Sequence, residues 1–345
     1  MRKELSNILI CGLVSTGSSA LVDLLREYNN MNHIPGEFDD FRAPGLVADQ
    51  LSHPQSVEFI NEIEKLTNLD LRSRIKWIYN VLPIFTIFKW EIKKIRGIRG
   101  RFRLLLTRNR QLNLLKKLNI KLYSDISFKD KIRYANQWIA DVGGINLNNN
   151  EFVVYNQPIH LVIDTCIWKE VFHPWKLICV YRDPKDQLAE IIKNGYFYAP
   201  YGAPYVNHGG AVLETIYGRS RKGAMNFHID ALRKRFEWID FMKKEFDSDQ
   251  FLLIDFEGLV NNYDEYKSII ENFIGGIKPH HKNVKSYFDP INAKKSIGIY
   301  KEYLNGNEIE SLKELENWYK NMIKSNLIIQ KTKACDIKRM IQTKY

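Results

Sequence analysis

The feature that most constrains this chain is an apolar run that leads directly into a glycine loop. The run, residues 7–11 (NILIC), is short, rich in isoleucine and bounded by Gly12, which is typical of a strand buried on both faces. From Gly17 onward leucines recur at the spacing of a helix. We therefore predict a strand, a glycine loop and a helix in direct succession.

The same order of strand and helix returns later in the chain. Residues 175–181 (WKLICVY) and 251–255 (FLLID) have the composition of buried strands. A helix is expected over residues 185–194, after the first of these strands, and another from about Met225 to Phe246, before the second. This alternation favours an α/β fold in which helices flank a central parallel sheet.

One segment departs from this alternation of strands and helices and carries the net positive charge of the chain. Between Lys89 and Lys121 twelve Lys and Arg residues face one acid, Glu91, so the local net charge of +11 equals that of the whole chain. Leucines and isoleucines punctuate the segment, and no internal repeat or Gly/Ser-rich linker is present. We predict a single domain over residues 1–330, with a basic, mostly helical insertion at about 50–150 and a C-terminal tail at 331–345.

Composition excludes several classes of protein. With 45% hydrophobic and 12% aromatic residues, the chain is not disordered. Its four cysteines have no paired spacing, which excludes a zinc-ribbon site and a dense disulfide framework, and no metal site is expected. Cys11 and Cys179 lie in apolar runs and are predicted to be buried thiols.

No membrane-spanning helix is predicted. The best candidate, residues 77–90, is interrupted by Asn80 and Pro83, and it is shorter than the ~20 apolar residues that a bilayer requires. Arg2 and Lys3 before an apolar stretch imitate a signal peptide, but Glu4 spoils the basic segment. We expect a cytoplasmic protein, and the basic segment leaves peripheral contact with an anionic membrane surface open.

The glycine loop has the frame of a nucleotide P-loop without its lysine. Gly12 and Gly17 have the required spacing, and backbone amides at the start of a helix bind anions. The position of the P-loop lysine is Ser18, however, so an ordinary ATPase or GTPase would lack its main phosphate cation. The hydroxyls around Gly17 suit an oxyanion. A plain turn that needs glycines only for its geometry is the alternative.

Four segments together resemble the sulfotransferases that use 3′-phosphoadenosine 5′-phosphosulfate (PAPS). Residues 15–21 (STGSSAL) look like the 5′-phosphosulfate loop of that family, and residues 180–186 (VYRDPKD) are similar to its 3′-phosphate motif. Residues 253–260 (LIDFEGLV) resemble its later strand-and-turn segment. Residues 295–301 (KSIGIYK) look like its C-terminal loop, which closes over the nucleotide. The branch suggested is the bacterial, carbohydrate-type or Golgi-like one.

The resemblance implies a P-loop NTPase-like fold, a PAPS donor site and no metal. Arg182 would grip the 3′-phosphate, although a surface salt bridge with Asp183 or Asp186 is the alternative for this side chain. A solvated basic turn is the alternative for the closing loop. The residues expected to bind the donor are Ser15, Thr16, Gly17, Ser18, Ser19, Ala20, Arg182, Lys294, Lys295 and Ser296.

Two positions depart from the family pattern. Ser15 stands where the family usually has a Lys or Arg that neutralises charge on the leaving phosphate, and losing one such group commonly costs ~3 kcal/mol. A replacement from Arg42 or the C-terminal lysines would be needed. Glu190 stands where the family commonly has a serine that contacts the 3′-phosphate. Its carboxylate would have to turn away or meet a cation such as Lys193.

The predicted catalytic base is Glu37. In several bacterial relatives the resemblance places a catalytic carboxylate at the end of the second strand, and the turn at residues 35–36 could aim this side chain into the cleft. Asp39, Asp40 and His33 compete for the role, and a solvated acidic loop is the alternative. On the acceptor side, residues 156–158 (NQP) and the aromatic run 196–205 are candidates, with turn chemistry and packing as alternatives.

The resulting prediction is a sulfotransferase that moves the sulfuryl group in line onto a hydroxyl or amine of a carbohydrate or glycolipid. The basic segment motivates the acceptor, because it would attract an anionic saccharide or an acidic membrane face. One alternative is a degenerate module that binds nucleotide or glycan without turnover. A P-loop kinase is another, which Ser18 disfavours. Nucleic-acid binding ranks last, because no recognised motif accompanies the basic segment.

Overall fold

The structure is a computed structural model that describes residues 6–12, 14–37, 152–159, 167–202, 207–277 and 285–325, with several residues between 127 and 136. Most of the predicted insertion at 50–150, including the whole basic segment from Lys89 to Lys121, lies outside the described residues. So do Asp39, Asp40, Arg42 and the predicted tail at 331–345.

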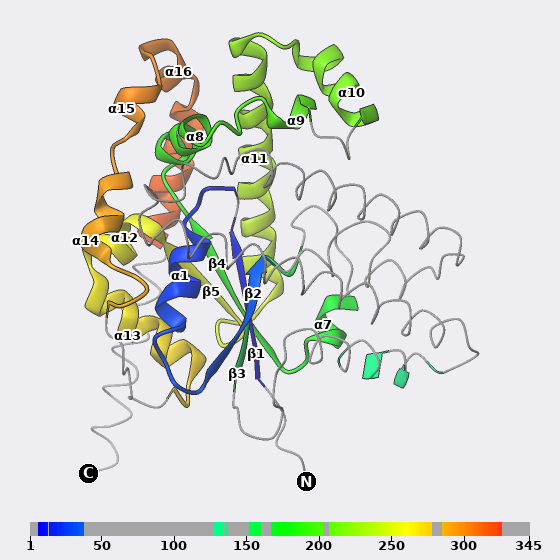
Figure 1. The fold of residues 1–345 in the computed structure, drawn as a ribbon, viewed down its shortest axis with the longest axis vertical. Coiled ribbons are helices and arrows are strands. Elements are labelled where there is room, and N and C mark those ends of the chain that lie inside the picture. Colours follow the sequence, from blue (N-terminus) through cyan, green and yellow to red (C-terminus); the bar gives the residue numbers. More distant parts are fainter. Residues whose placement is uncertain are drawn as a thin grey trace, which may run out of the picture. The chain divides into compact units, whose positions relative to one another are not determined.

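Five strands form one sheet in the order β2-β3-β1-β4-β5 (Figure 1). The strands are β1 (Ser6–Gly12), β2 (Met31–Glu37), β3 (Phe152–Asn156), β4 (Trp175–Tyr181) and β5 (Phe251–Asp255). They run parallel and are flanked by helices, which confirms the predicted α/β class. The two strands predicted at 175–181 and 251–255 have the observed bounds, because each is an uninterrupted apolar run.

Most described helices lie after β4. They are α1 (Ser18–Leu25), α7 (Ile167–Val171), α8 (Pro184–Lys193), α9 (Ala199–Gly202), α10 (Asn207–Tyr217), α11 (Arg221–Glu245), α12 (Phe256–Asn261), α13 (Tyr263–Ile274), α14 (Pro290–Ala293), the 3-10 helix η3 (Lys294–Ser296), α15 (Tyr300–Tyr303), α16 (Gly306–Ser311) and a helix over residues 313–325. The prediction placed the start of α11 four residues late. Ser220 caps it, with its hydroxyl accepting from the Gly223 amide at 3.1 Å.

The chain divides into two compact units, and the division falls within β1. The first unit comprises residues 1–9 and 30–175. In it β2 and β3 pair in parallel, and the register is irregular between His33 and Glu37. Pro35 lies in this irregular stretch and has no amide to donate to the ladder. Asn7 anchors the same unit by donating from its side chain to the Phe172 carbonyl at 2.7 Å.

The second unit comprises residues 10–29 and 176–345 and contains most of the predicted nucleotide site. Its core includes the leucines that gave α1 its helical spacing, Leu21, Leu24 and Leu25, all fully buried. Cys11 and Cys179 are free, buried thiols, as predicted. Burial raises the pKa of the Cys179 thiol well above its usual value, so it stays neutral in the core.

Candidate functional site

The order of the strands brings the two predicted anion-binding segments together. β1 and β4 are neighbours in the sheet, but the chain continues from β1 to β2 on one side and from β4 to β5 on the other. In parallel α/β sheets such a switch point, at the carboxyl ends of the strands, is where ligands bind. The loop at residues 14–17 follows β1, and Arg182 is the first residue after β4.

The loop after β1 is tightly folded. Ser15 and Gly17 both have left-handed backbone, with φ of 63° and 89°. A Cβ on Gly17 would lie 2.2 Å from the ring of Phe256, and one on Gly12 would lie 2.2 Å from the Thr16 hydroxyl oxygen. Close packing therefore requires a glycine at both positions, and the left-handed backbone is a further requirement at Gly17.

The helix α1 begins immediately after Gly17, which caps it without a side-chain hydrogen bond. The hydroxyl-bearing residues of the loop do not share one environment, because Thr16 and Ser18 are buried whereas Ser19 is exposed. Backbone amides at the start of α1, rather than a row of four exposed hydroxyls, are the groups that this loop can offer to an anion.

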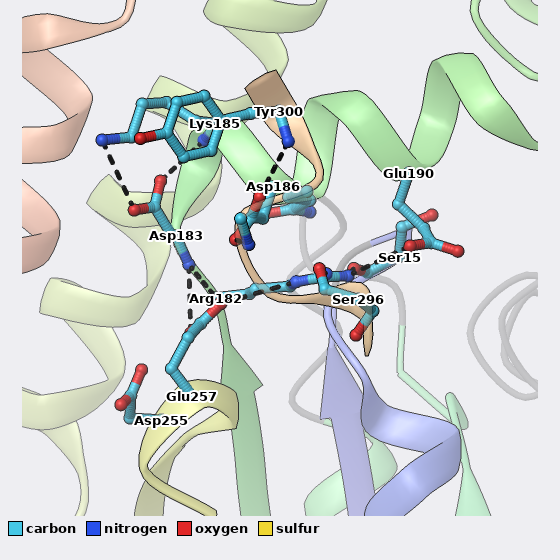
Figure 2. Close-up of polar contacts among 12 residues, drawn as sticks. Ser15, Arg182, Asp183, Lys185, Asp186, Glu190, Asp255, Glu257, Ser296 and Tyr300 are labelled. Atoms are coloured by element: carbon cyan, nitrogen blue, oxygen red, sulfur yellow. Dashed lines mark hydrogen bonds and ion pairs between the residues drawn. The ribbon is translucent and has the colours of Figure 1, made fainter. Parts of the chain in front are cut away.

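Arg182 joins three segments that lie far apart in the sequence (Figure 2). It is 3% exposed, and its Nη1 donates to the Ser15 carbonyl at 3.1 Å. Its Nη2 donates to the Ser296 carbonyl at 2.5 Å. The guanidinium also lies 4.9 Å from the centre of the Phe256 ring, in a cation–π contact. The glycine loop, the end of β4 and the C-terminal segment thus meet at one buried cation.

Two carboxylates face this cation. Glu190 Oε2 lies 3.8 Å from Nη1, and Glu257 Oε1 lies 3.5 Å from Nε. The alternative of a surface salt bridge with Asp183 or Asp186 is wrong, because Arg182 is buried and those two carboxylates bond elsewhere. The Asp183 carboxylate caps α8 by accepting from the Lys185 amide at 2.8 Å.

Asp186 fixes the C-terminal segment to α8. Its carboxylate accepts from the Gly298 amide at 2.7 Å. It also accepts from the Tyr300 amide at 3.1 Å (Figure 2). Lys294 and Lys295 lie exposed on η3, and Lys295 Nζ donates to the Asn292 side chain at 3.0 Å. Of the three predicted closing-loop residues, Ser296 bonds to Arg182, and it does so through its carbonyl.

A buried acidic cluster adjoins Arg182 and was missed by the sequence analysis. The Tyr319 hydroxyl lies 2.7 Å from Asp255 Oδ1 and 2.8 Å from Glu257 Oε2. Burial, and then the neighbouring Asp255 charge, raise the pKa of Glu257 to about 8, against the lowering effects of Tyr319 and Arg182. Glu257 is therefore largely protonated at neutral pH. The available signal was the pair of carboxylates directly after the buried strand β5.

Glu37 is the last residue of β2, in the first unit, so it ends the second strand as predicted, but residues 35–36, which were expected to form a turn, lie within that strand. Its backbone partner in the register is Asn156, the last residue of β3. Asn156 is buried, and its Oδ1 has no hydrogen-bond partner among the described residues. The next residue, Gln157, is buried with a left-handed φ of 57°. The segment 156–158 is therefore more constrained than an ordinary surface turn.

The aromatic run predicted at residues 196–205 is described up to residue 202, and residues 203–205 lie outside the described part of the chain. Tyr196 and Tyr198 are 57% and 42% exposed, whereas Phe197 between them is buried and stacks on the ring of His228. His228 Nε2 lies 2.8 Å from the Phe197 carbonyl, and burial lowers its pKa. The two exposed tyrosines are available to a partner, while Phe197 and His228 form packing.

Among the described residues, no group of three or more His, Cys, Asp or Glu side chains could hold a metal ion. The helices of these residues include none with the length and apolar character needed to cross a membrane.

Fold and site together define an α/β protein with a glycine loop and a buried arginine at the switch point of a parallel sheet. No protein-family model matches the chain, and no curated protein matches it. Three solved structures are similar to it: the sulfotransferase domain from the olefin synthase of Synechococcus PCC 7002 (13% identity, TM-score 0.42, 86% of this chain and 88% of that one), the sulfotransferase domain from the curacin biosynthetic pathway (13%, 0.44, 91% and 98%) and a sulfotransferase from Mycobacterium tuberculosis H37Rv (14%, 0.40, 86% and 77%).

Proposed function

We propose that this protein is a sulfotransferase that transfers the sulfuryl group of PAPS to a hydroxyl or amine of a carbohydrate or glycolipid. One observation carries the proposal most directly. Arg182 bonds the loop at Ser15 and the segment at Ser296, so it unites the three segments whose resemblance assigns them to the nucleotide. The three motifs meet in space, and this supports a common ligand more strongly than their presence in the sequence does.

In the proposed site the amides at the start of α1 hold the 5′-phosphosulfate, and Arg182 faces the 3′-phosphate. During transfer the bond between sulfur and the donor's phosphate oxygen breaks while a bond from sulfur to the acceptor oxygen or nitrogen forms. Glu37 takes the acceptor's proton. Positioning and electrostatics supply most of the acceleration, by analogy with phosphoryl transfer.

Arg182 also offers a solution to the missing cation at Ser15. Its Nη1 lies 3.1 Å from the Ser15 carbonyl, whereas Lys294 and Lys295 are exposed on η3. Glu257 is largely protonated at neutral pH, so Glu190 is the carboxylate that partly offsets the arginine's charge. We propose that Arg182 supplies the positive charge beside the loop that a Lys or Arg at position 15 would otherwise supply.

The acceptor side of the proposal uses the ends of β2 and β3. The backbones of Glu37 and Asn156 are register partners, and Asn156 presents a buried amide oxygen to which no described residue donates a hydrogen bond. A buried acceptor atom of this kind is costly unless a donor reaches it. A hydroxyl of the substrate would be such a donor, and a carbohydrate carries several.

The second candidate is a protein that binds nucleotide without turnover. The ion pair between Arg182 and Glu190 favours this candidate. The Glu190 carboxylate already faces Nη1, one of the guanidinium nitrogens that would bind the nucleotide's phosphate. A transfer assay decides between the two functions, since only the enzyme would release or transfer labelled sulfate.

The first experiment compares thermal stabilisation by adenosine 3′,5′-bisphosphate with that by ATP plus Mg²⁺. A ligand at 100 times its Kd stabilises the folded state by about 2.7 kcal/mol. We expect the bisphosphate alone to raise Tm. A rise with ATP that depends on Mg²⁺, and none with the bisphosphate, would instead support a kinase.

The catalytic carboxylate is tested by Glu37→Gln with radiolabelled PAPS and a panel of saccharide acceptors. The amide cannot accept the proton, so transfer should be abolished while the affinity for adenosine 3′,5′-bisphosphate stays within a few-fold. Unchanged turnover would remove Glu37 from the role.

A further inference from the structure

Glu190 and Arg182 form an ion pair that is not also a hydrogen bond. Glu190 Oε2 is buried and has no hydrogen-bond partner among the described residues, and it forms an ion pair at 3.8 Å with Arg182 Nη1. Its Oε1 accepts a weak hydrogen bond from the Asn194 side chain at 3.3 Å. This carboxylate is therefore held by charge attraction more than by a network of hydrogen bonds, and it can be displaced at modest cost.

The other contacts of Arg182 are of a different kind. Its two terminal nitrogens donate to the backbone carbonyls of Ser15 and Ser296, and one face of the guanidinium meets the Phe256 ring. Nε faces Glu257, whose side chain is 14% exposed, compared with 20% for Glu190. Compared with Glu257, Glu190 is thus more exposed and less firmly bonded.

We infer that Glu190 is a specificity-determining residue of the nucleotide site, which competes with the ribose phosphate for Arg182 and makes that phosphate contribute little to affinity. This inference rests on the proposed function. A phosphate brings close to two negative charges at neutral pH. Charge repulsion from the Glu190 carboxylate disfavours a phosphate at this position. The ribose phosphate must therefore either displace Glu190 or share the Arg182 guanidinium with it.

The test compares two nucleotides that differ only in the ribose phosphate, adenosine 3′,5′-bisphosphate and adenosine 5′-monophosphate. Their dissociation constants are measured by calorimetry for the natural chain and for Glu190→Gln, which removes the charge and nearly keeps the shape. Glu271→Gln is the matched control, since Glu271 also lies on a helix and pairs with Lys267 at 2.8 Å. Melting curves confirm that each variant folds, and Glu190→Ser replaces the Gln variant if that one unfolds.

For the natural chain and the Glu271 control, we expect the two nucleotides to bind within a few-fold of each other. Glu190→Gln should lower the dissociation constant of the bisphosphate by about 10-fold or more and leave that of the monophosphate nearly unchanged. A neighbouring like charge shifts a pKa by about one unit or more, which corresponds to a tenfold change in an equilibrium constant. A large preference for the bisphosphate in the natural chain, unchanged in Glu190→Gln, would overturn the inference and leave the proposed function standing. If neither nucleotide binds any of the proteins, both fail.

Discussion

Gly17 is the residue at which the conformation of the loop is most demanding. An alanine there would add left-handed strain and would place its Cβ 2.2 Å from the Phe256 ring. Gly195 has a similar φ of 75°, but a Cβ there would meet nothing within 4 Å. Urea unfolding should therefore show a loss of about 1 kcal/mol for Gly195→Ala and of about 3 kcal/mol for Gly17→Ala. Equal losses would contradict the packing argument.

Arg182 stabilises the fold as well as the proposed ligand site. Its replacement by alanine removes the bonds to Ser15 and Ser296 and leaves the carboxylate of Glu190 without its cation. The loss of all these contacts together should cost about 3 kcal/mol. In a double-mutant cycle measured by urea unfolding, adding Glu190→Gln to Arg182→Ala should restore part of that loss. Simple additivity of the two changes would contradict the pairing.

Glu257 makes the stability of the protein depend on pH. Its pKa is raised to about 8, from an ordinary value of 4.5, so the folded state holds this proton more tightly than the unfolded state. Unfolding then releases protons in this window, and the free energy of unfolding falls as the pH rises from about 5 through 8. Asp255, whose pKa burial also raises, acts in the same direction.

Urea unfolding of the natural chain and of Glu257→Gln at several pH values measures this effect. The variant cannot ionise at this position, so its stability should decline less between pH 5 and 8. The same slope for both proteins would show that Glu257 is not the titrating group.

At the scale of elements, the C-terminal segment is held in place by side chains from distant helices. Asp186 on α8 accepts from the amides of Gly298 and Tyr300. The buried carboxylate of Glu27, just after α1, accepts from the amides of Lys285, Tyr287 and Phe288. The segment that would close over a nucleotide is thus tied to α8 and to the turn that follows α1.

Removing the Asp186 carboxylate should loosen this segment selectively. In Asp186→Ala we expect faster hydrogen exchange at the amides of Gly298 and Tyr300, a loss of about 2 kcal/mol in stability, and weaker binding of adenosine 3′,5′-bisphosphate. The amides held by Glu27 serve as the internal control. Unchanged exchange at Gly298 would contradict the assigned anchoring role.

The elements themselves were largely predictable from the sequence, because each depends on local patterns. The strands β4 and β5 are continuous apolar runs, and α8 starts at Pro184 behind its cap Asp183, one residue before the predicted start. The early start of α11 was missed because it depends on a single N-cap, the Ser220 hydroxyl that accepts from the Gly223 amide. A serine in a loop has no pattern that distinguishes a cap from a solvated side chain.

At the scale of the whole molecule, the parts of the site were predictable but their contacts were not. The glycine loop and Arg182 belong to local motifs, whereas their contact follows from β1 and β4 being neighbours in the sheet. Glu257 and Tyr319 are separated by 62 residues and meet only after the helix over residues 313–325 has packed. The two acidic residues around the end of β5 were a signal for part of that cluster, but no periodicity or spacing could have revealed the contact with Tyr319, or the pairing of Glu190 with Arg182.

A crystal structure of the protein with adenosine 3′,5′-bisphosphate tests the central claim most directly. The account predicts that the 5′-phosphate lies within hydrogen-bonding distance, about 3 Å, of the backbone amides at Gly17 to Ser19. It also predicts the 3′-phosphate beside Arg182, with the Glu190 carboxylate moved away from Nη1. A nucleotide bound away from this loop, with the contacts of Arg182 to Ser15 and Glu190 unchanged, would contradict it.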